Sequence, residues 1–290
     1  MGSPEAADAV LTWKVLAIKR PGLSRDLPPG NEKLMWVANS VTLICGKRDA
    51  VLVDTFLTVE QSRILLDWIA ASGKNLVAVY ITHGHGDHFF GLAPVLERFP
   101  GARAVAIPEV VEAMRARLAP AEVDSYWRKL FPGQIPDRLL AAEPLADDRL
   151  ELEGHELVVV NAGRTDTVYT TSLYAPSAAL IVAGDVVYNG IHPFLAETDT
   201  RSRLEWTAAL DRLEALKPKA VVAGHKVPEN ADDPSDIAAT RQYIADFDRL
   251  DARTATAREL YDAMLALYPD RANPGSLWRS ANAAKKLAGA

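Results

Sequence analysis

Three histidines and one aspartate stand close together in the segment His83-Gly84-His85-Gly86-Asp87-His88. His83 and His85 are two residues apart, so in an extended stretch both side chains project to the same side and can reach one ion. Asp87 and His88 follow a turn that the intervening glycine permits, and they can face a second ion nearby. Imidazole and carboxylate groups are good zinc ligands. The spacing therefore predicts a site for one or two metal ions.

The elements before this segment predict how it is positioned. Residues 76–81 form a continuous apolar run that leads directly into it, as expected of a strand buried on both faces. Residues 51–53 form a similar run, and residues 59–72 between them have a helical period that ends at Gly73. This strand–helix–strand unit predicts a sheet with helices against it. Loops at the carboxyl ends of such strands are where α/β proteins place their ligands.

The second half of the chain predicts further strands and a helical end. Short runs rich in β-branched residues indicate strands, whereas the period of residues 203–216 is helical. From residue 235 onward only helical periodicity is found, in three stretches. We therefore expect one domain over residues 1–290, with a two-sheet α/β core at about 11–230 and a helical extension at about 235–290. The predicted strands are residues 156–161, 169–174, 179–183 and 220–223.

The histidine-rich segment has the His-x-His-x-Asp-His signature of the metallo-β-lactamase (MBL) superfamily, and the order of later residues fits the same resemblance. Asp54 after an early strand resembles the family's structural aspartate. Asp185, after Ala183-Gly184, resembles the metal-bridging aspartate, and His225, after Ala223-Gly224, resembles the last histidine ligand. The resemblance covers about residues 40–226. It implies an αββα metallo-β-lactamase sandwich, with the metals at one edge of the two sheets and the C-terminal helical extension outside the common core.

The resemblance also implies roles for single residues. Asp54 would hydrogen-bond backbone near the site rather than bind metal, and Asp87 would orient a water molecule as well as bind metal. Tyr188, His192 and Phe194 follow Asp185 and are predicted to contact substrate, although ordinary packing would explain each of them as well. The implied zinc ligands are His83, His85, Asp87, His88, Asp185 and His225.

One position departs from the family pattern. Where the family carries a histidine in Gly-His-Thr, this chain has Gly163-Arg164-Thr165. A guanidinium group stays protonated and has no lone pair for a metal, so the ion of His83 and His85 loses a ligand. Three hypotheses follow. In the first, a single zinc binds and Arg164 is a catalytic cation that pairs with Asp87 or Asp185 or holds a substrate oxyanion. In the second, two ions bind, with water or His192 in the vacant place, and in the third an impaired protein keeps the fold.

The implied function is a zinc-dependent hydrolase that attacks an ester, lactone, amide or phosphoester of a small molecule with metal-bound hydroxide. The alternative is a metal-poor binding protein of the same fold. Other enzyme classes lack support, because no dinucleotide-binding Gly-x-Gly-x-x-Gly, phosphate-binding loop or Gly-x-Ser-x-Gly elbow is present. The apolar residues of the helical extension would also suit a dimer interface, so a homodimer is a further expectation.

Composition narrows the partners further. A net charge of −6 without a basic stripe opposes a nucleic-acid partner. No apolar run is long enough to span a bilayer, and Met1-Gly2-Ser3-Pro4-Glu5 lacks a secretory pattern, so a cytoplasmic location is expected. The single cysteine, Cys45, excludes an intrachain disulfide and is predicted to be a small buried residue on a strand.

Overall fold

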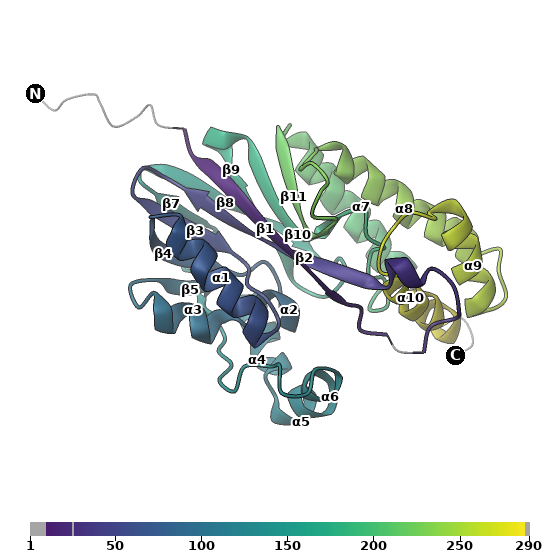
Figure 1. The fold of residues 1–290 in the computed structure, drawn as a ribbon. Helices are drawn as coiled ribbons and strands as arrows, with labels where there is room; N and C mark the ends of the chain where they lie inside the picture. Colours follow the sequence, from purple (N-terminus) through teal and green to yellow (C-terminus); the bar gives the residue numbers. More distant parts are fainter. Residues whose placement is uncertain (1–9, 25, 288–290) are drawn as a thin grey trace, which may run out of the picture. The chain divides into compact units, whose positions relative to one another are not determined.

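The computed structural model describes residues 10–24 and 26–287 (Figure 1), so the N-terminal segment assessed above for a secretory pattern lies outside the described residues. The chain divides into two compact units. Unit 1 comprises Met1–Leu16, Val41–Val160 and Thr171–Val182. Unit 2 comprises Ala17–Ser40, Asn161–Thr170 and Ala183–Ala290. The single-domain division with a core at 11–230 stays a prediction.

Unit 1 contains a mixed sheet. The strands β3 (Asp49–Val53), β4 (Asn75–Tyr80), β5 (Arg103–Ala106) and β6 (Glu143–Pro144) pair in parallel in that order. The last part of β2 (Trp36–Cys45) pairs antiparallel with β3. The parallel pairs explain the continuous apolar runs of β3 and β4, because strands of this kind are largely covered on both faces, and in β4 only Val77 of the run is exposed.

The register of β3 and β4 brings two loops together. Val53 pairs with Tyr80, so both strands end at the same edge of the sheet. The N–H of Asp54 donates to the Tyr80 carbonyl over 2.8 Å and continues this pairing by one residue. The residues that follow Val53 and Tyr80 are therefore neighbours in space.

The helix α1 (Val59–Ala71) joins β3 to β4, as the sequence predicts. Thr58 and Gln61 form a capping box at its first turn, and Gly73, at φ +69°, follows its last residues. Two helices that periodicity does not show, α2 (Gly86–Phe89) and α3 (Leu92–Arg98), follow β4. α2 escapes prediction because it has only four residues, all of them buried, so neither face is polar, and α3 has only seven residues.

The remaining elements of unit 1 are short helices and antiparallel strands. β7 (Arg149–Leu152) pairs with β8 (His155–Gly163), and β9 (Thr170–Ala175) pairs with β10 (Leu180–Asn189). A 3-10 turn at Pro176–Ala178 joins β9 to β10. The helical segments between β5 and β6 are α4 (Pro108–Arg117), α5 (Pro120–Glu122), a π-helical turn at Val123–Trp127, and α6 (Arg128–Leu130).

Unit 2 combines the ends of several strands with the α-helices α7 to α10. β11 (Ala220–Lys226) pairs antiparallel with the first part of β2, where His225 lies opposite Asn39. The predicted helical stretches are confirmed as α7 (Thr200–Ala215), α8 (Ser235–Asp251), α9 (Ala257–Leu267) and α10 (Pro274–Leu287). α8 packs against α7 and α9, and α9 packs against α10 (Figure 1).

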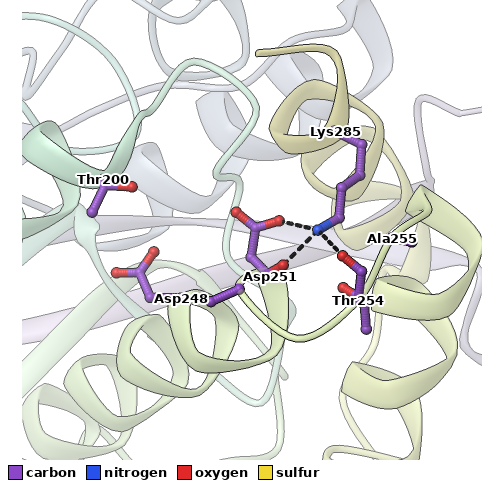
Figure 2. A pocket seen from close by; sticks show the side chains of 7 residues that line it. Thr200, Asp248, Asp251, Thr254, Ala255 and Lys285 are labelled. Carbon is purple, nitrogen blue, oxygen red and sulfur yellow. Dashed lines mark hydrogen bonds and ion pairs between the residues drawn. The ribbon is translucent and has the colours of Figure 1, made fainter. Parts of the chain in front are cut away.

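Lys285 anchors the last helix of unit 2 to the end of α8. Its Nζ donates to the backbone carbonyls of Asp251 and Thr254 over 2.6 and 2.8 Å, and it lies 2.5 Å from Asp251 Oδ1 (Figure 2). These residues line a hollow of about 550 Å³ together with Asp248, whose carboxylate accepts the Nε hydrogen of Arg203 over 2.6 Å. The charged groups of the hollow thus hold the helices of the extension together.

One expectation from composition is met. Cys45 is buried at the end of β2, and burial raises the pKa of its thiol, so its environment is that of a packing residue rather than a nucleophile. Among the helices of residues 10–24 and 26–287, none has the length and apolar character to cross a membrane.

Candidate metal centre

The histidine-rich loop of unit 1 begins directly after β4. His83 and His88 are fully buried, Asp87 is 6% exposed and His85 is half-buried. The imidazole ring of His83 has its centroid 4.9 Å from that of His85 and 4.3 Å from that of His88. The loop thus gathers the three imidazole rings that the sequence places within six residues.

Both glycines of the loop are required for this close packing. A Cβ at Gly84 would lie 2.9 Å from the Cβ of Ala113, on α4. A Cβ at Gly86 would lie 2.7 Å from the ring of Phe90. Neither position has a positive φ, so the need for glycine comes from the close approach of neighbours rather than from the backbone conformation.

Asp54 connects the end of β3 to this loop. Its Oδ1 accepts the backbone N–H of Thr82 over 2.8 Å, and its Oδ2 accepts the Thr82 hydroxyl hydrogen over 2.8 Å. Oδ2 also lies 3.0 Å from Nδ1 of His88. The residue has φ +61°, in the left-handed region that Asp adopts more readily than most side chains. Asp54 is 2% exposed, and these bonds give its buried carboxylate the partners it requires.

Hydrogen bonds made by Nδ1 fix the ring tautomers of three histidines. A carboxylate and a carbonyl only accept, so His88 donates from Nδ1 to Asp54, and His225 donates from Nδ1 to the Ala38 carbonyl over 3.1 Å. The Thr82 hydroxyl donates to Asp54 and accepts from Nδ1 of His83 over 3.0 Å. In this tautomer Nε2 is the nitrogen that can bind a metal.

In unit 2, Asp185 and His225 lie together. Asp185 is on β10 and His225 is on β11, and Oδ2 of Asp185 is 3.2 Å from Nε2 of His225. The Tyr188 hydroxyl donates to the same carboxylate oxygen over 3.0 Å, and its ring stacks on the imidazole with centroids 5.6 Å apart. Burial first, and then the charges of Asp185 and Asp166, raise the pKa of Tyr188 well above its usual value, so the phenol keeps its hydrogen.

In the loop between β8 and β9, Asp166 rather than the residue at position 164 is buried. Arg164 is exposed, and its Nη2 donates to the backbone carbonyl of Glu197 over 3.2 Å. Asp166, two residues later, is fully buried. The structure thus turns the residue at the family's histidine position outward and turns a carboxylate inward.

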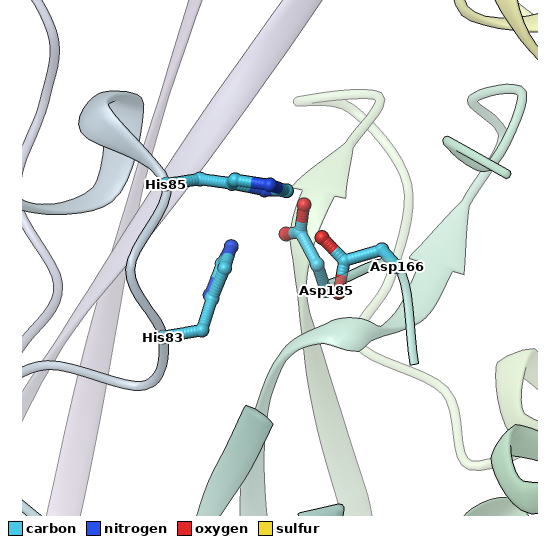
Figure 3. Close-up of side chains that lie close together, drawn as sticks. All are labelled: His83, His85, Asp166 and Asp185. Carbon is cyan, nitrogen blue, oxygen red and sulfur yellow. The ribbon is translucent and has the colours of Figure 1, made fainter. Parts of the chain in front are cut away.

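Two groups of side chains in the described part of the chain could each hold a metal ion. The ligand atoms of the first group, and likewise those of the second, lie within 4.8 Å of one another. Figure 3 draws the first group, with His83 and His85 on the loop that follows β4 and with both aspartates. The first group is His83, His85, Asp166 and Asp185, and the second is Asp87, His88 and His225.

The groups contain every residue that the sequence predicted as a ligand and one that it did not. Asp166 was missed because the family pattern directs attention to position 164. The signal that could have found it is a carboxylate two residues beyond the arginine, in Thr165-Asp166-Thr167. Nitrogen and carboxylate oxygen donors of this kind suit zinc and other divalent transition metals, so the residues present fit a metal ion.

The predicted substrate-binding residues lie in unit 2 with packing partners of their own. His192 is fully buried, and its Nδ1 lies 2.9 Å from the Tyr243 hydroxyl. Burial, and then the charge of Arg271, lower the pKa of His192 to about 3. Phe194 is half-buried, with the guanidinium carbon of Arg279 5.3 Å from its ring centroid. Contact with substrate stays a prediction for these residues and for Tyr188.

Comparison with known proteins identifies the family. The sequence model of the Metallo-beta-lactamase superfamily matches residues 34–225, about two thirds of the chain. The chain therefore belongs to the metallo-β-lactamase superfamily, and the expected α/β fold, an αββα sandwich with a C-terminal helical extension, is confirmed.

Solved structures agree on the fold. A metallo-beta-lactamase family protein from Thermus thermophilus is 23% identical, with 95% of this chain and 93% of that chain covered and a TM-score of 0.62. A metallo-beta-lactamase from Pontibacter korlensis is 22% identical, with 72% of this chain and 88% of that chain covered and a TM-score of 0.55. At these identities the likeness concerns the fold alone.

A curated relative is similar over a shorter stretch. Ribonuclease Z from Thermobifida fusca (strain YX) is 28% identical over 105 residues, which is 36% of this chain. The match spans 31% of the relative's length, so the chain corresponds to less than a third of that protein.

Proposed function

We propose that the protein is a metal-dependent hydrolase that cleaves an ester, lactone, amide or phosphoester bond in a small-molecule substrate, with zinc as its metal. One observation carries the proposal: two groups of histidine and aspartate side chains, each with its ligand atoms within 4.8 Å of one another, include all four residues of the superfamily signature. A pair of adjacent metal ions is the arrangement that many hydrolases use.

The chain's own residues would prepare the site for the reaction. Bound zinc lowers the pKa of a coordinated water molecule to about 7 and polarises the bond to be cleaved. Asp54 holds the imidazole of His88 in the required tautomer directly and that of His83 through Thr82. Tyr188 orients the Asp185 carboxylate in the same way. Asp87 is the group we assign to hold the attacking water in position and to accept its proton.

Two observations support the choice of candidate substrates. The likeness to a ribonuclease Z supports keeping phosphoesters among the candidate bonds. RNA itself is not part of the proposal, because a net charge of −6 opposes the binding of a polyanion. Arg164 is exposed and would serve an anionic group of a substrate only from the rim of the loop.

The first test is the zinc content of the desalted protein, measured by elemental mass spectrometry. We expect about two zinc ions per chain, and about one after His88→Ala or Asp185→Ala. His155→Ala is the matched control, since His155 begins β8 and belongs to neither group. A panel of esters, lactones, amides and phosphoesters then identifies the bond. A protein that takes up no zinc when zinc is supplied would instead be a metal-free binding protein of this fold.

A further inference from the structure

We propose that Asp166 is a metal ligand and takes the place of the histidine that the superfamily carries at the position of Arg164. The inference rests on the proposed function and deepens it, because it concerns how the first group holds its ion. With Asp166 included, this group offers two imidazole nitrogens and two carboxylates, from His83, His85, Asp166 and Asp185.

The first argument is the conformation of the loop between β8 and β9. Thr165, Asp166 and Thr167 are buried, whereas Arg164 before them and Tyr169 after them are exposed. The middle of the loop therefore points into the protein and its two ends point to solvent. A histidine at position 164 of this loop would be on the exposed side.

A set of hydrogen bonds fixes this conformation. The Thr165 hydroxyl donates to Oδ1 of Asp166 over 2.9 Å and lies 2.8 Å from the Thr170 hydroxyl. The Thr170 hydroxyl in turn bonds the Gly163 carbonyl over 3.1 Å, across the base of the loop. Gly163 has φ +75°, which favours glycine at the point where the loop leaves β8.

The outer side of the loop is fixed as well. Arg164 donates to the Glu197 backbone carbonyl over 3.2 Å, and the Thr167 hydroxyl donates to the Glu197 carboxylate over 2.8 Å. The charge of Arg164 also helps to lower the pKa of Asp199, the residue that caps α7, after the larger effects of the Asp199–Ser202 hydrogen bonds. Arg164 is thus tied to the segment before α7, and this holds the guanidinium outside the group of ligands.

The second argument is the position and burial of the Asp166 carboxylate. It is fully buried, and burial of a charged carboxylate is costly unless positive charge or donors compensate it. Its ligand oxygen lies within 4.8 Å of the ligand atoms of the other three members of the group. A divalent ion among these atoms would compensate two carboxylates at once.

The exchange of an imidazole for a carboxylate changes which ion the group favours. Carboxylates suit harder ions such as Mn²⁺ better than imidazoles do, whereas imidazole favours zinc. We therefore expect the first group to distinguish Zn²⁺ from Mn²⁺ less strongly than the histidine-bearing version of the same group would.

The test compares metal binding by the full-length protein and four variants, with Zn²⁺ and Mn²⁺ offered separately and the bound metal counted by elemental mass spectrometry. Asp166→Asn keeps the shape of the side chain and removes the charge. Asp166→His restores an imidazole, and Arg164→His places one where the family has it. Asp211→Asn is the control, because the Asp211 side chain is 64% exposed on α7 and pairs with Arg241.

We expect Asp166→Asn to lose one of two bound ions, with an affinity at least about 100-fold weaker, since loss of an outer partner alone costs about 10–100-fold. Asp166→His should retain two ions, with a Zn²⁺-to-Mn²⁺ affinity ratio raised about tenfold. Arg164→His and the control should bind metal as the unmodified protein does. Far-UV circular dichroism checks that every variant is folded. If Asp166→Asn does not fold, the Zn²⁺-to-Mn²⁺ ratio of Asp166→His decides the test.

Two results would overturn the inference while the proposed function stands: two tightly bound ions in Asp166→Asn, or a gain of bound metal in Arg164→His. Failure of the proposed function looks different. In that case the unmodified protein would bind neither ion, and His88→Ala, which alters only the second group, would change nothing.

Discussion

The Nδ1–H of His88 donates to the Asp54 carboxylate over 3.0 Å, and this bond joins the end of β3 to α2, the short helix after β4. The carboxylate also holds Thr82, through which it reaches His83. One buried side chain thus fixes the tautomers of two imidazoles that belong to different groups of candidate ligands. Asp54 is expected to act on metal binding without contacting the metal.

Asp54→Asn should weaken zinc binding and destabilise the fold. Asparagine tolerates the left-handed φ of this position, so the loss of the charge is the main change. We expect zinc affinity to fall about 10–100-fold, and the free energy of unfolding to fall by about 2 kcal/mol, because the lost bonds involve a charged acceptor. Zinc titration against a chromophoric chelator and urea denaturation measure the two effects. Asp67→Asn, exposed on α1, should change neither.

Gly224→Ala should damage the centre through a single methyl group. A Cβ at this position of β11 would lie 2.3 Å from Oδ1 of Asp185 and 2.8 Å from the carbonyl carbon of Gly184. Overpacking of this kind costs about 1–3 kcal/mol. It should also displace the carboxylate and lower the zinc content by about one ion per chain. Gly101→Ala is the control, since nothing lies within 4 Å of its Cβ; equal zinc content in both variants would contradict the assignment of Asp185.

Most of the fold was predictable because short stretches of the sequence carry the pattern of each helix and strand. The strand–helix–strand unit before His83 is marked by two apolar runs, a helical period and a capping glycine, and the structure confirms each part. The helices after residue 235 were equally clear, since Pro269 to Pro274 separates the last two. α2 was missed because residues buried on every side carry no period, and α3 was missed because its seven residues make only about two turns.

The candidate site was predictable where spacing alone determines geometry. His83 to His88 are close in sequence, so their grouping followed from the strand that leads into them. Asp166 could not be assigned this way, because its burial depends on hydrogen bonds that cross the loop from Gly163 to Thr170. Sequence comparison aligns position 164 with a ligand, and only the course of the loop shows that this residue is exposed.

Removal of metal should lower the free energy of unfolding by an amount that depends on the affinity of the folded protein for the metal. A ligand that binds only the folded state stabilises it by about 2.7 kcal/mol when its free concentration is 100 times its Kd. We expect the thermal midpoint to fall on treatment with a chelator and to recover with added zinc. The control is His88→Ala, whose midpoint should respond less because one group of ligands is incomplete. A midpoint that ignores both chelator and zinc would argue against a structural contribution from metal.

His192 should make the fold less stable as the pH falls. Its pKa is about 3 in the folded protein against 6.5 for the free side chain, chiefly because of burial and then because of Arg271. The unfolded state therefore binds more protons between pH 6.5 and pH 3, so stability contributed by the neutral imidazole is present above pH 6.5 and is lost as the pH falls below it. From pH 7 to pH 5 this loss amounts to about 2 kcal/mol.

The measurement is urea denaturation of the chelator-treated protein at pH 7 and pH 5, with His192→Gln as the comparison. Glutamine keeps a partner for the Tyr243 hydroxyl but does not titrate, so the variant should lack this part of the pH dependence. Groups that titrate in both proteins, such as Asp236, cancel in the difference. If both proteins lose the same free energy between the two pH values, the imidazole of His192 exchanges protons with solvent in the folded state, and burial does not hold it neutral.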